Sequence, residues 1–418
     1  MSPLTSYRQL FALSGATYVL VAFLGRLPLA MSQLGTLLLV AGSTGSYGAG
    51  GASAGALAVA NAVGSPVAGA LADRVGQRAV VLAQSLAGAA GLVALVLLAS
   101  AGAPWPAQAA AAALTGLLMP QVGPLARVRW RPITRHAGAD QPRLVNVAFS
   151  YEGAADEASF VIGPALVGAA AAVVAPAAAL VVAAAVLAVF GSWFALHPTV
   201  HLVRRAREAA THTRGRLFTG SLVLLCLAQL IIGTVFGSAQ TATSQMATAA
   251  GVPGLTGGLH ALLGVGSVVA GLAVAMLPDR FPYEQRLRVF AAGLLVLALP
   301  LLAVNSLPAL ALALGVLGLA VAPYMISVFT LAERITPPQR TGAAMTVLAG
   351  ATGMGYAVGS SVAGQLADAS GHTAAFGVTV TAGVLATALT LAAAPLLRAE
   401  QRRVASPASA EVEALQPA

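Results

Sequence analysis

Charged side chains inside long apolar segments are the residues of this sequence most able to do chemistry. Glu152, Asp156 and Glu157 fall in one such segment, and Arg26 lies in another. A charge in hydrocarbon is costly, so such residues usually face a cavity or a partner. Glu152 and Asp156 share a helix face, whereas Glu157 points about 100° away from Asp156. Two like charges one turn apart in a low dielectric favour protonation of one of them, which suits a proton carrier. The plainer interpretation is that Glu152 is hydrated and that only one acid is functional.

Arg26 is the cation that matches these acids. At ~1.5 Å per residue, Arg26 lies roughly 24 Å and Glu157 roughly 18 Å from the face at which their helices start. A long side chain spans that difference. We therefore expect Arg26 to pair with Glu157 or Asp156 in one state, and with substrate or nothing in another. The alternatives are a purely structural ion pair and an arginine that snorkels outward.

A short polar turn separates two apolar segments at residues 69–78. Its spaced residues resemble the loop signature of the major facilitator superfamily, G-x-L-a-D-R-x-G-[RK]-[RK]: Gly69, Leu71, Asp73, Arg74, Gly76 and Arg78, with Gln77 in place of a basic residue. The resemblance implies that Asp73 contacts the N-terminus of the eleventh helix, near Arg340 to Ala343, when the two halves close on the cytoplasmic side. The loop would then act as a cytoplasmic latch. The alternative is a solvated loop acid.

Another part of the fifth apolar segment resembles an antiporter signature of the same family, G-x8-G-x3-G-P-x2-G-G. The matching residues are Gly163, Pro164 and Gly168. The match is partial, and an ordinary Gly-Pro kink is the competing interpretation. The fourth segment has Met119-Pro120-Gln121-Val122-Gly123 where the family's antiporters carry R-x-x-Q-G.

The composition indicates a membrane protein. Hydrophobic residues make up 58% of the 418 residues and charged residues only 8%, which excludes a soluble domain of this size. Spans of ~20 apolar residues predict an all-α polytopic membrane protein with 12 transmembrane helices. The resemblance implies the fold of that family, in which the helices form two pseudo-symmetric six-helix bundles. The expected helices lie near 10–36, 46–72, 78–101, 106–129, 145–172, 175–197, 217–245, 253–278, 287–305, 308–332, 341–366 and 373–397.

The arginines predict the orientation, because basic residues concentrate in cytoplasmic loops. With the N-terminus inside, every arginine except Arg26 falls on the cytoplasmic side, those at 127, 129 and 131 included. We therefore expect a multi-pass protein of the cytoplasmic (inner) cell membrane with both termini in the cytoplasm. This orientation explains the net charge of +9 and leaves no indication of nucleic-acid binding. Cys226 is the only cysteine, so no disulfide or thiolate metal site is expected.

Internal repeats predict the division of the chain. Gly64-Ser65 and Gly69 recur as Gly266-Ser267 and Gly271 at an offset of 202, and residues around the fourth and tenth segments recur at the same offset. Gly163 and Gly168 match Gly359 and Gly364 at an offset of 196, and we expect these glycines to lie at helix interfaces or kinks. The predicted parts are an N-terminal bundle (1–197), a cytoplasmic linker (198–216), a C-terminal bundle (217–397) and a disordered cytoplasmic tail (398–418).

The seventh segment supplies uncharged polar residues that we expect to line a cavity between the bundles: Gln229, Thr234, Ser238, Gln240 and Thr241. These features favour a secondary transporter that exports a small organic molecule by alternating access in exchange for protons. The alternative is a sugar or metabolite permease that works by uptake or uniport. We find no motif of a membrane enzyme, and a scaffold or receptor would not need the latch. The expected partners are a small-molecule substrate and lipid, for a monomer with no cofactor or metal and with the proton gradient as its energy source.

Overall fold

The computed structural model describes residues 3–209, 219–252, 255–278 and 281–413. The regular structure of these residues is helical. The main helices are α1 (Pro3–Ser14), α2 (Ala16–Thr44), α3 (Tyr47–Val75), α4 (Gln77–Ser100), α5 (Trp105–Leu118), α6 (Val122–Ile133), α7 (Gln141–Val173), α8 (Pro176–Val186), α9 (Ser192–Leu196), α10 (Thr199–Ala209), α11 (Gly220–Ala249), α12 (Thr256–Ala273), α13 (Tyr283–Ala298), α14 (Leu307–Ile335) and α15 (Thr341–Glu413). Short helical turns extend several of them: η1 (Arg135–Asp140), η2 (Leu187–Gly191), η4 (Val274–Met276), η5 (Leu299–Ala303) and η6 (Pro338–Arg340).

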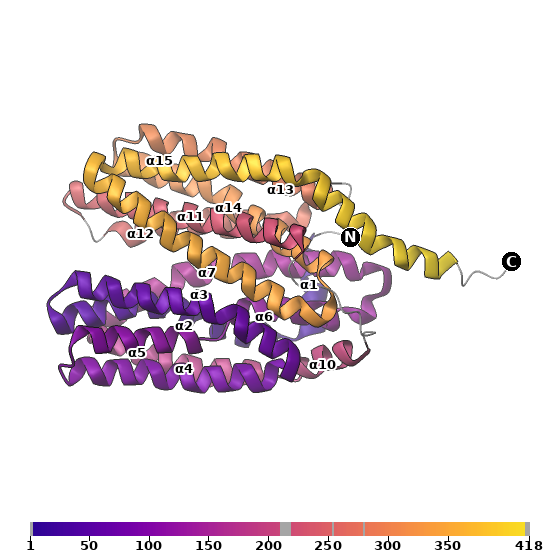
Figure 1. The fold of residues 1–418 in the computed structure, drawn as a ribbon, viewed down its shortest axis with the longest axis horizontal. Coiled ribbons are helices and arrows are strands. Elements are labelled where there is room, and N and C mark those ends of the chain that lie inside the picture. Colours follow the sequence, from indigo (N-terminus) through magenta and orange to yellow (C-terminus); the bar gives the residue numbers. More distant parts are fainter. Residues whose placement is uncertain (1–2, 210–218, 253–254, 279–280, 414–418) are drawn as a thin grey trace.

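The helices form two groups that lie side by side in Figure 1, α2 to α9 in one and α11 to α15 in the other. The buried apolar side chains form two clusters in the first group and one larger cluster in the second, which also takes in Val128 of α6 and Val145 and Phe149 of α7. The α1 and α10 helices and the last part of α15 lie at the same end of the molecule (Figure 1). We call this end the α10 end. The domain boundaries themselves stay a prediction.

Eleven of the described helical segments are long and apolar enough to cross a membrane, so the chain is a multi-pass membrane protein. The predicted span at 341–366 is helical but is not among the eleven, because glycine, serine and threonine dilute its apolar residues. It forms the first part of α15, which continues into the predicted twelfth helix. Gly371, with a φ of 79°, separates the two parts, and only glycine adopts that backbone conformation readily.

The first and fourth spans differ from the prediction. The first begins only at Ala16, because Gly15 with a φ of 78° separates α2 from α1, and it extends to Thr44. The fourth is discontinuous, since α5 ends at Leu118 and α6 begins at Val122. Pro120 causes this break, because proline lacks an N–H and pushes the preceding residue out of the helical conformation. Met119 accordingly has extended φ and ψ of −68° and 126°.

The backbone groups that this break frees are bound by side chains. Asn61 of α3 donates from Nδ2 to the carbonyls of Gly116 at 3.0 Å and Met119 at 3.3 Å. Gln121 in turn donates from Nε2 to Asn61 Oδ1 at 2.6 Å. Such satisfaction is needed because an unpaired backbone group inside a membrane protein costs several kcal/mol.

The linker and the tail are more regular than predicted. The predicted linker 198–216 contains α10, which packs against α6, and residues 210–216 lie outside the described part of the chain. The predicted disorder over 398–413 is wrong, because α15 runs as a helix to Glu413. Residues 414–418 lie outside the described residues.

The glycines matched by the repeat make equivalent helix contacts. A Cβ at Gly163 would lie 2.8 Å from Ala30 Cβ, so α7 packs closely on α2. Gly359 packs α15 on α11 in the same way, against the carbonyl of Thr234. Gly168 has open space around it and Gly364 makes an ordinary contact. Helix α7 runs unbroken through Pro164, so the predicted Gly-Pro element serves as a close helix contact and does not interrupt the helix.

Candidate functional site

Four charged side chains meet in the interior of the first group of helices. Arg26 of α2 reaches Glu152 Oε2 with Nη2 at 2.6 Å and Asp156 Oδ1 with Nη1 at 2.9 Å. Arg127 of α6 places Nη1 at 2.8 Å from the other oxygen of Asp156, Oδ2. We call Arg26, Arg127, Glu152 and Asp156 the charge cluster. Its two cations and two carboxylates balance in charge.

The two acids of the charge cluster differ in their surroundings. Glu152 is fully buried, and its second oxygen, Oε1, accepts a hydrogen bond from Trp130 Nε1 at 2.7 Å. Both oxygens of Glu152 are therefore engaged by buried donors. The side chain of Asp156 is 19% exposed. Glu152 is thus a fixed counter-ion of Arg26, and Asp156 is the acid that retains access to solvent.

The predicted pairing of Arg26 is confirmed for Asp156 and wrong for Glu157. Glu157 is 5% exposed and takes part in none of the ion pairs of the described residues. It lies beside Ser267 of α12, in the second group of helices. The helical rotation that separates Glu157 from Asp156 explains this direction. The alternative interpretation, in which Glu152 is hydrated, is wrong, because Glu152 is fully buried and bonded to Trp130 of α6.

Arg127 is the residue that sequence reasoning missed. The predicted fourth helix ends at 129, and Arg127 is assigned to its cytoplasmic end, whereas the span continues to Ile133 and leaves Arg127 only 2% exposed. Its guanidinium carbon lies 4.3 Å from the ring centre of Phe329 on α14, within the range of a cation–π interaction. Trp130, an aromatic residue among these arginines, is the sequence signal that the buried segment extends further.

Arg129 is also buried, and it donates hydrogen bonds to three neighbouring residues. It donates to Gln77 Oε1 at 3.0 Å, to the carbonyl of Phe194 at 2.9 Å and to Thr199 Oγ1 at 3.0 Å. Gln77, the departure from the loop signature, therefore holds a buried guanidinium. Burial first, and then the charge of Arg129, lower the pKa of His197 at the end of α9.

The loop signature makes the predicted contact with α15. Asp73 accepts hydrogen bonds from the backbone N–H of Gly342 at 3.1 Å and of Ala343 at 2.7 Å. A carboxylate at a helix N-terminus is favoured by the helix dipole and by the unpaired N–H groups there. A Cβ at Gly69 would lie 2.9 Å from the carbonyl of Gly342, so only glycine allows α3 to approach α15 this closely.

The remaining signature residues shape the turn. Gly76 has a φ of 104° and connects α3 directly to α4, which a residue with a side chain would resist. Arg74 and Arg78 are exposed and take part in none of the ion pairs of the described residues.

Helices α6 and α14 contact each other through residues that are equivalent in the repeat. Arg131 pairs with Glu333, with Nη2 at 3.2 Å from Oε2. Both this pair and Arg127 with Phe329 are 202 residues apart, the offset of the repeat. In each contact an arginine of α6 meets a residue of α14 that attracts it, a carboxylate in one and an aromatic ring in the other. We call these two contacts the α6–α14 pairs.

The predicted polar lining lies mostly within the second group of helices. Thr234 donates to the carbonyl of Gly355, and Ser238 bonds Thr379 Oγ1 at 2.8 Å, so both face α15 of their own group. Gln240 accepts from Tyr356 and Gln229 from Thr352, also on α15. Thr241 donates to its own helix, to the carbonyl of Gly237. The α-helical rotation places these residues toward α15, which the sequence of α11 alone does not reveal.

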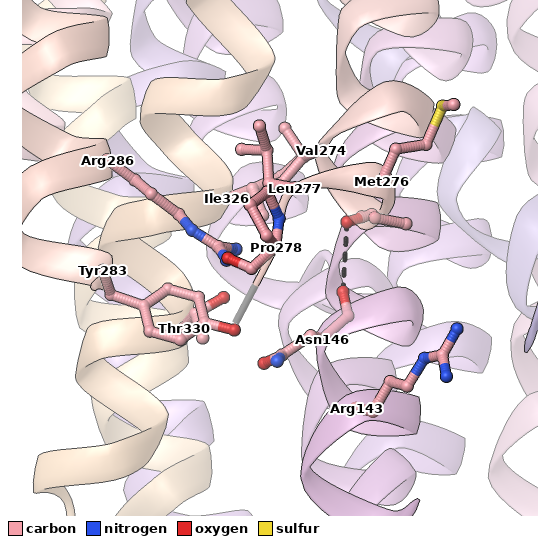
Figure 2. A pocket seen from close by; sticks show the side chains of 12 residues that line it. Arg143, Asn146, Val274, Met276, Leu277, Pro278, Tyr283, Arg286, Ile326 and Thr330 are labelled. Carbon is pink, nitrogen blue, oxygen red and sulfur yellow. Dashed lines mark hydrogen bonds between the residues drawn. The ribbon is translucent and has the colours of Figure 1, made fainter. Parts of the chain in front are cut away.

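A pocket of about 210 Å³ opens near the α10 end between α7, η4, α13 and α14. Figure 2 shows Arg143 and Asn146 on its α7 side and Tyr283 and Arg286 on its α13 side. Ala275, which also lines it, is the repeat equivalent of Asp73. A methyl group therefore stands here where the first half has the carboxylate. Helix α7, which carries the predicted acids, borders this pocket, but none of the predicted site residues lines it. The described residues contain no group of three potential metal ligands.

The fold and one half of the sequence have known counterparts. Residues 225–416 match the family profile described as Major Facilitator Superfamily. No curated protein sequence matches the chain. Similar solved structures include the human organic anion transporter MFSD10 (TETRAN), with 19% identity, 90% of this chain and 99% of that chain covered and a TM-score of 0.70. A bacterial homologue of the iron transporter ferroportin in an outward-facing state has 16% identity, coverage of 90% and 98% and a TM-score of 0.68.

The proton:xylose symporter XylE, bound to 6-bromo-6-deoxy-D-glucose, is similar at 15% identity, with 90% of this chain and 94% of that chain covered and a TM-score of 0.67. At these identities the similarity concerns the fold. The chain has the all-α, polytopic fold of the Major Facilitator Superfamily.

Proposed function

We propose that this protein is a secondary transporter that moves a small organic molecule across the membrane by alternating access, with export in exchange for protons as its mode. The observation that carries the proposal is the Asp73 carboxylate at the N-terminus of α15. This contact joins the two halves at the α10 end and must break before that end can open. A contact of this kind stabilises one of two states and leaves the other accessible.

The closed α10 end suggests which state this is. Asp73, the α6–α14 pairs and the hydrogen bond from Tyr7 OH to the Leu272 carbonyl at 2.9 Å all hold the halves together there. With the orientation predicted from the arginines, this end is cytoplasmic. The structure then corresponds to a state that is closed toward the cytoplasm, and the latch role of Gly69, Asp73 and Gly76 is part of the proposal.

The buried acids support proton coupling. Glu157 lies at the contact between α7 and α12, beside Ser267, where its burial as an anion is costly. Movement of α7 relative to α12 exposes this carboxyl to water and so links its protonation to the state of the halves. Asp156 offers a second carboxyl next to Arg26. We therefore assign proton or substrate coupling to Arg26, Asp156 and Glu157, with Glu152 as a fixed counter-ion.

A distance measurement tests alternating access. Spin labels at Val75 and Arg340, two exposed positions beside the Asp73 contact, are introduced in a Cys226→Ala background. We expect two distance populations, the shorter of which agrees with this structure, and a change of their ratio with pH. A single population under every condition would refute the proposal.

Transport in vesicles tests the coupling. Reconstituted protein with a pH-sensitive dye inside the vesicle should move protons when a transported compound, found by a thermal-shift screen at two pH values, is added. Asp156→Asn and Glu157→Gln should reduce this movement. Transport without proton movement, insensitive to both changes, would favour the sugar or metabolite permease instead.

A further inference from the structure

We propose that the transported molecule is an organic anion with one carboxylate and an apolar body, and that its carboxylate binds between Arg26 and Arg127 in the place that Asp156 occupies in this state. The proposal rests on the transport function proposed above. It names the class of substrate from the charge and geometry of the charge cluster.

The charge balance allows one exchangeable anion. Glu152 is committed on both oxygens, to Arg26 and to Trp130. Asp156 is therefore the acid that neutralises Arg127, and it is the exposed member of the pair. When Asp156 turns away, the cluster has one positive charge left, which a monoanion neutralises.

The arrangement of donors resembles that around a bound carboxylate. Each oxygen of Asp156 faces a different arginine, at 2.9 Å and 2.8 Å. Nε of Arg127 is buried and has no hydrogen-bond partner among the described residues. Arginine binds carboxylates best through two parallel N–H groups. A ligand carboxylate is not tied to the α7 backbone, so it can accept from Nε and one Nη of Arg127 together. Asp156 in its present position lies near Nη1 alone.

The broken fourth span adds to this preference for an anion. A Cβ at Gly123, in the first turn of α6, would lie 2.6 Å from Asp156 Oδ1, so the carboxylate sits against the start of this helix. Half-helices that begin inside the membrane direct the positive end of their dipole at the anionic groups of substrates. Arg127 lies one turn further along the same helix.

The α14 side chains that pack on the charge cluster are apolar. Phe329 lies over the guanidinium of Arg127, and Ile326 packs directly on Gly153 of α7, where an added Cβ would lie 2.5 Å from it. These side chains offer no partner for a second charge and favour an aromatic or aliphatic body. A single carboxylate on such a body suits both the arginines and these apolar neighbours.

Binding of three matched probes to the purified full-length protein tests the proposal, with benzoate as the anion, benzylamine as the cation and benzyl alcohol as the neutral molecule. We expect the wild type to bind benzoate in preference to the other two. Asp156→Asn removes the competing carboxylate and should bind benzoate at least about ten-fold more tightly, whereas Arg127→Gln should bind it at least about ten-fold more weakly. Arg127→Lys keeps the positive charge but lacks the two parallel N–H groups, so its affinity for benzoate should lie between those of the wild type and Arg127→Gln. Arg135→Gln, the same change at an exposed arginine, should leave the affinity unaltered.

A preference for benzylamine, or a benzoate affinity that neither Asp156→Asn nor Arg127→Gln changes, would overturn the assignment. The spin-label distances separate this result from failure of the transport proposal. If they still change with pH, the substrate class is wrong and the transport function stands. If they show one population throughout, the transport function fails too.

Discussion

Replacement of Asp73 by asparagine should shift the protein away from the state closed at the α10 end. The carboxylate accepts two backbone N–H groups, from Gly342 at 3.1 Å and Ala343 at 2.7 Å. Asparagine keeps one acceptor oxygen but loses the charge, and therefore the attraction to the helix dipole. Loss of that attraction costs about 0.3–2 kcal/mol, and complete loss of the cap, as in Asp73→Ala, costs about 0.5–2 kcal/mol. An effect of ~1–2 kcal/mol changes a two-state ratio about 5–30-fold.

The spin-label distance between Val75 and Arg340 measures that ratio directly. We expect the longer distance to gain weight in Asp73→Asn and to dominate in Asp73→Ala, which removes both acceptors. Asp140→Asn is the matched control, since Asp140 is an exposed acid near the α10 end. If Asp73→Asn and Asp140→Asn give the same distance distribution, Asp73 is not a latch.

Three further changes have defined outcomes. Arg131→Glu should open the α10 end through repulsion from Glu333, and the exchanged pair Arg131→Glu with Glu333→Arg should restore the distance distribution, with an effect of ~0.2–1 kcal/mol because Arg131 is 57% exposed. Gly69→Val should push α3 from α15 and lower the thermal stability by about 1–3 kcal/mol; a variant as stable as the wild type would mean that the helices separate without cost. Burial and Arg129 lower the pKa of His197, so the folded protein favours its neutral form, and stability should fall as the pH drops below the ordinary histidine value of 6.5 toward the lowered one. His197→Gln should flatten that acid side of the melting-temperature profile, and an unchanged slope would exclude this histidine as its cause.

The sequence by itself determined the class of protein, most of its spans and one contact between distant segments. Apolar stretches must cross a bilayer whatever their neighbours do, and eleven of the twelve predicted helices recur as apolar spans. The contact of Asp73 with Gly342 and Ala343 was also predictable, because the loop resembles the signature of the major facilitator superfamily and that resemblance implies the contact. Arg26 and Asp156 were found since charges inside apolar segments stand out.

Only the tertiary structure decided how these residues are partnered. The fourth span breaks at Pro120 and continues to Ile133, so Arg127, which was expected at the cytoplasmic end of this span, lies beside Asp156. Glu152, and not Glu157, meets Arg26 beside Asp156, because helix rotation and the position of Trp130 on α6 decide which acid reaches this arginine. Spacing along one helix fixes which side chains share a face, but which neighbour that face meets depends on the packing of helices far apart in the chain.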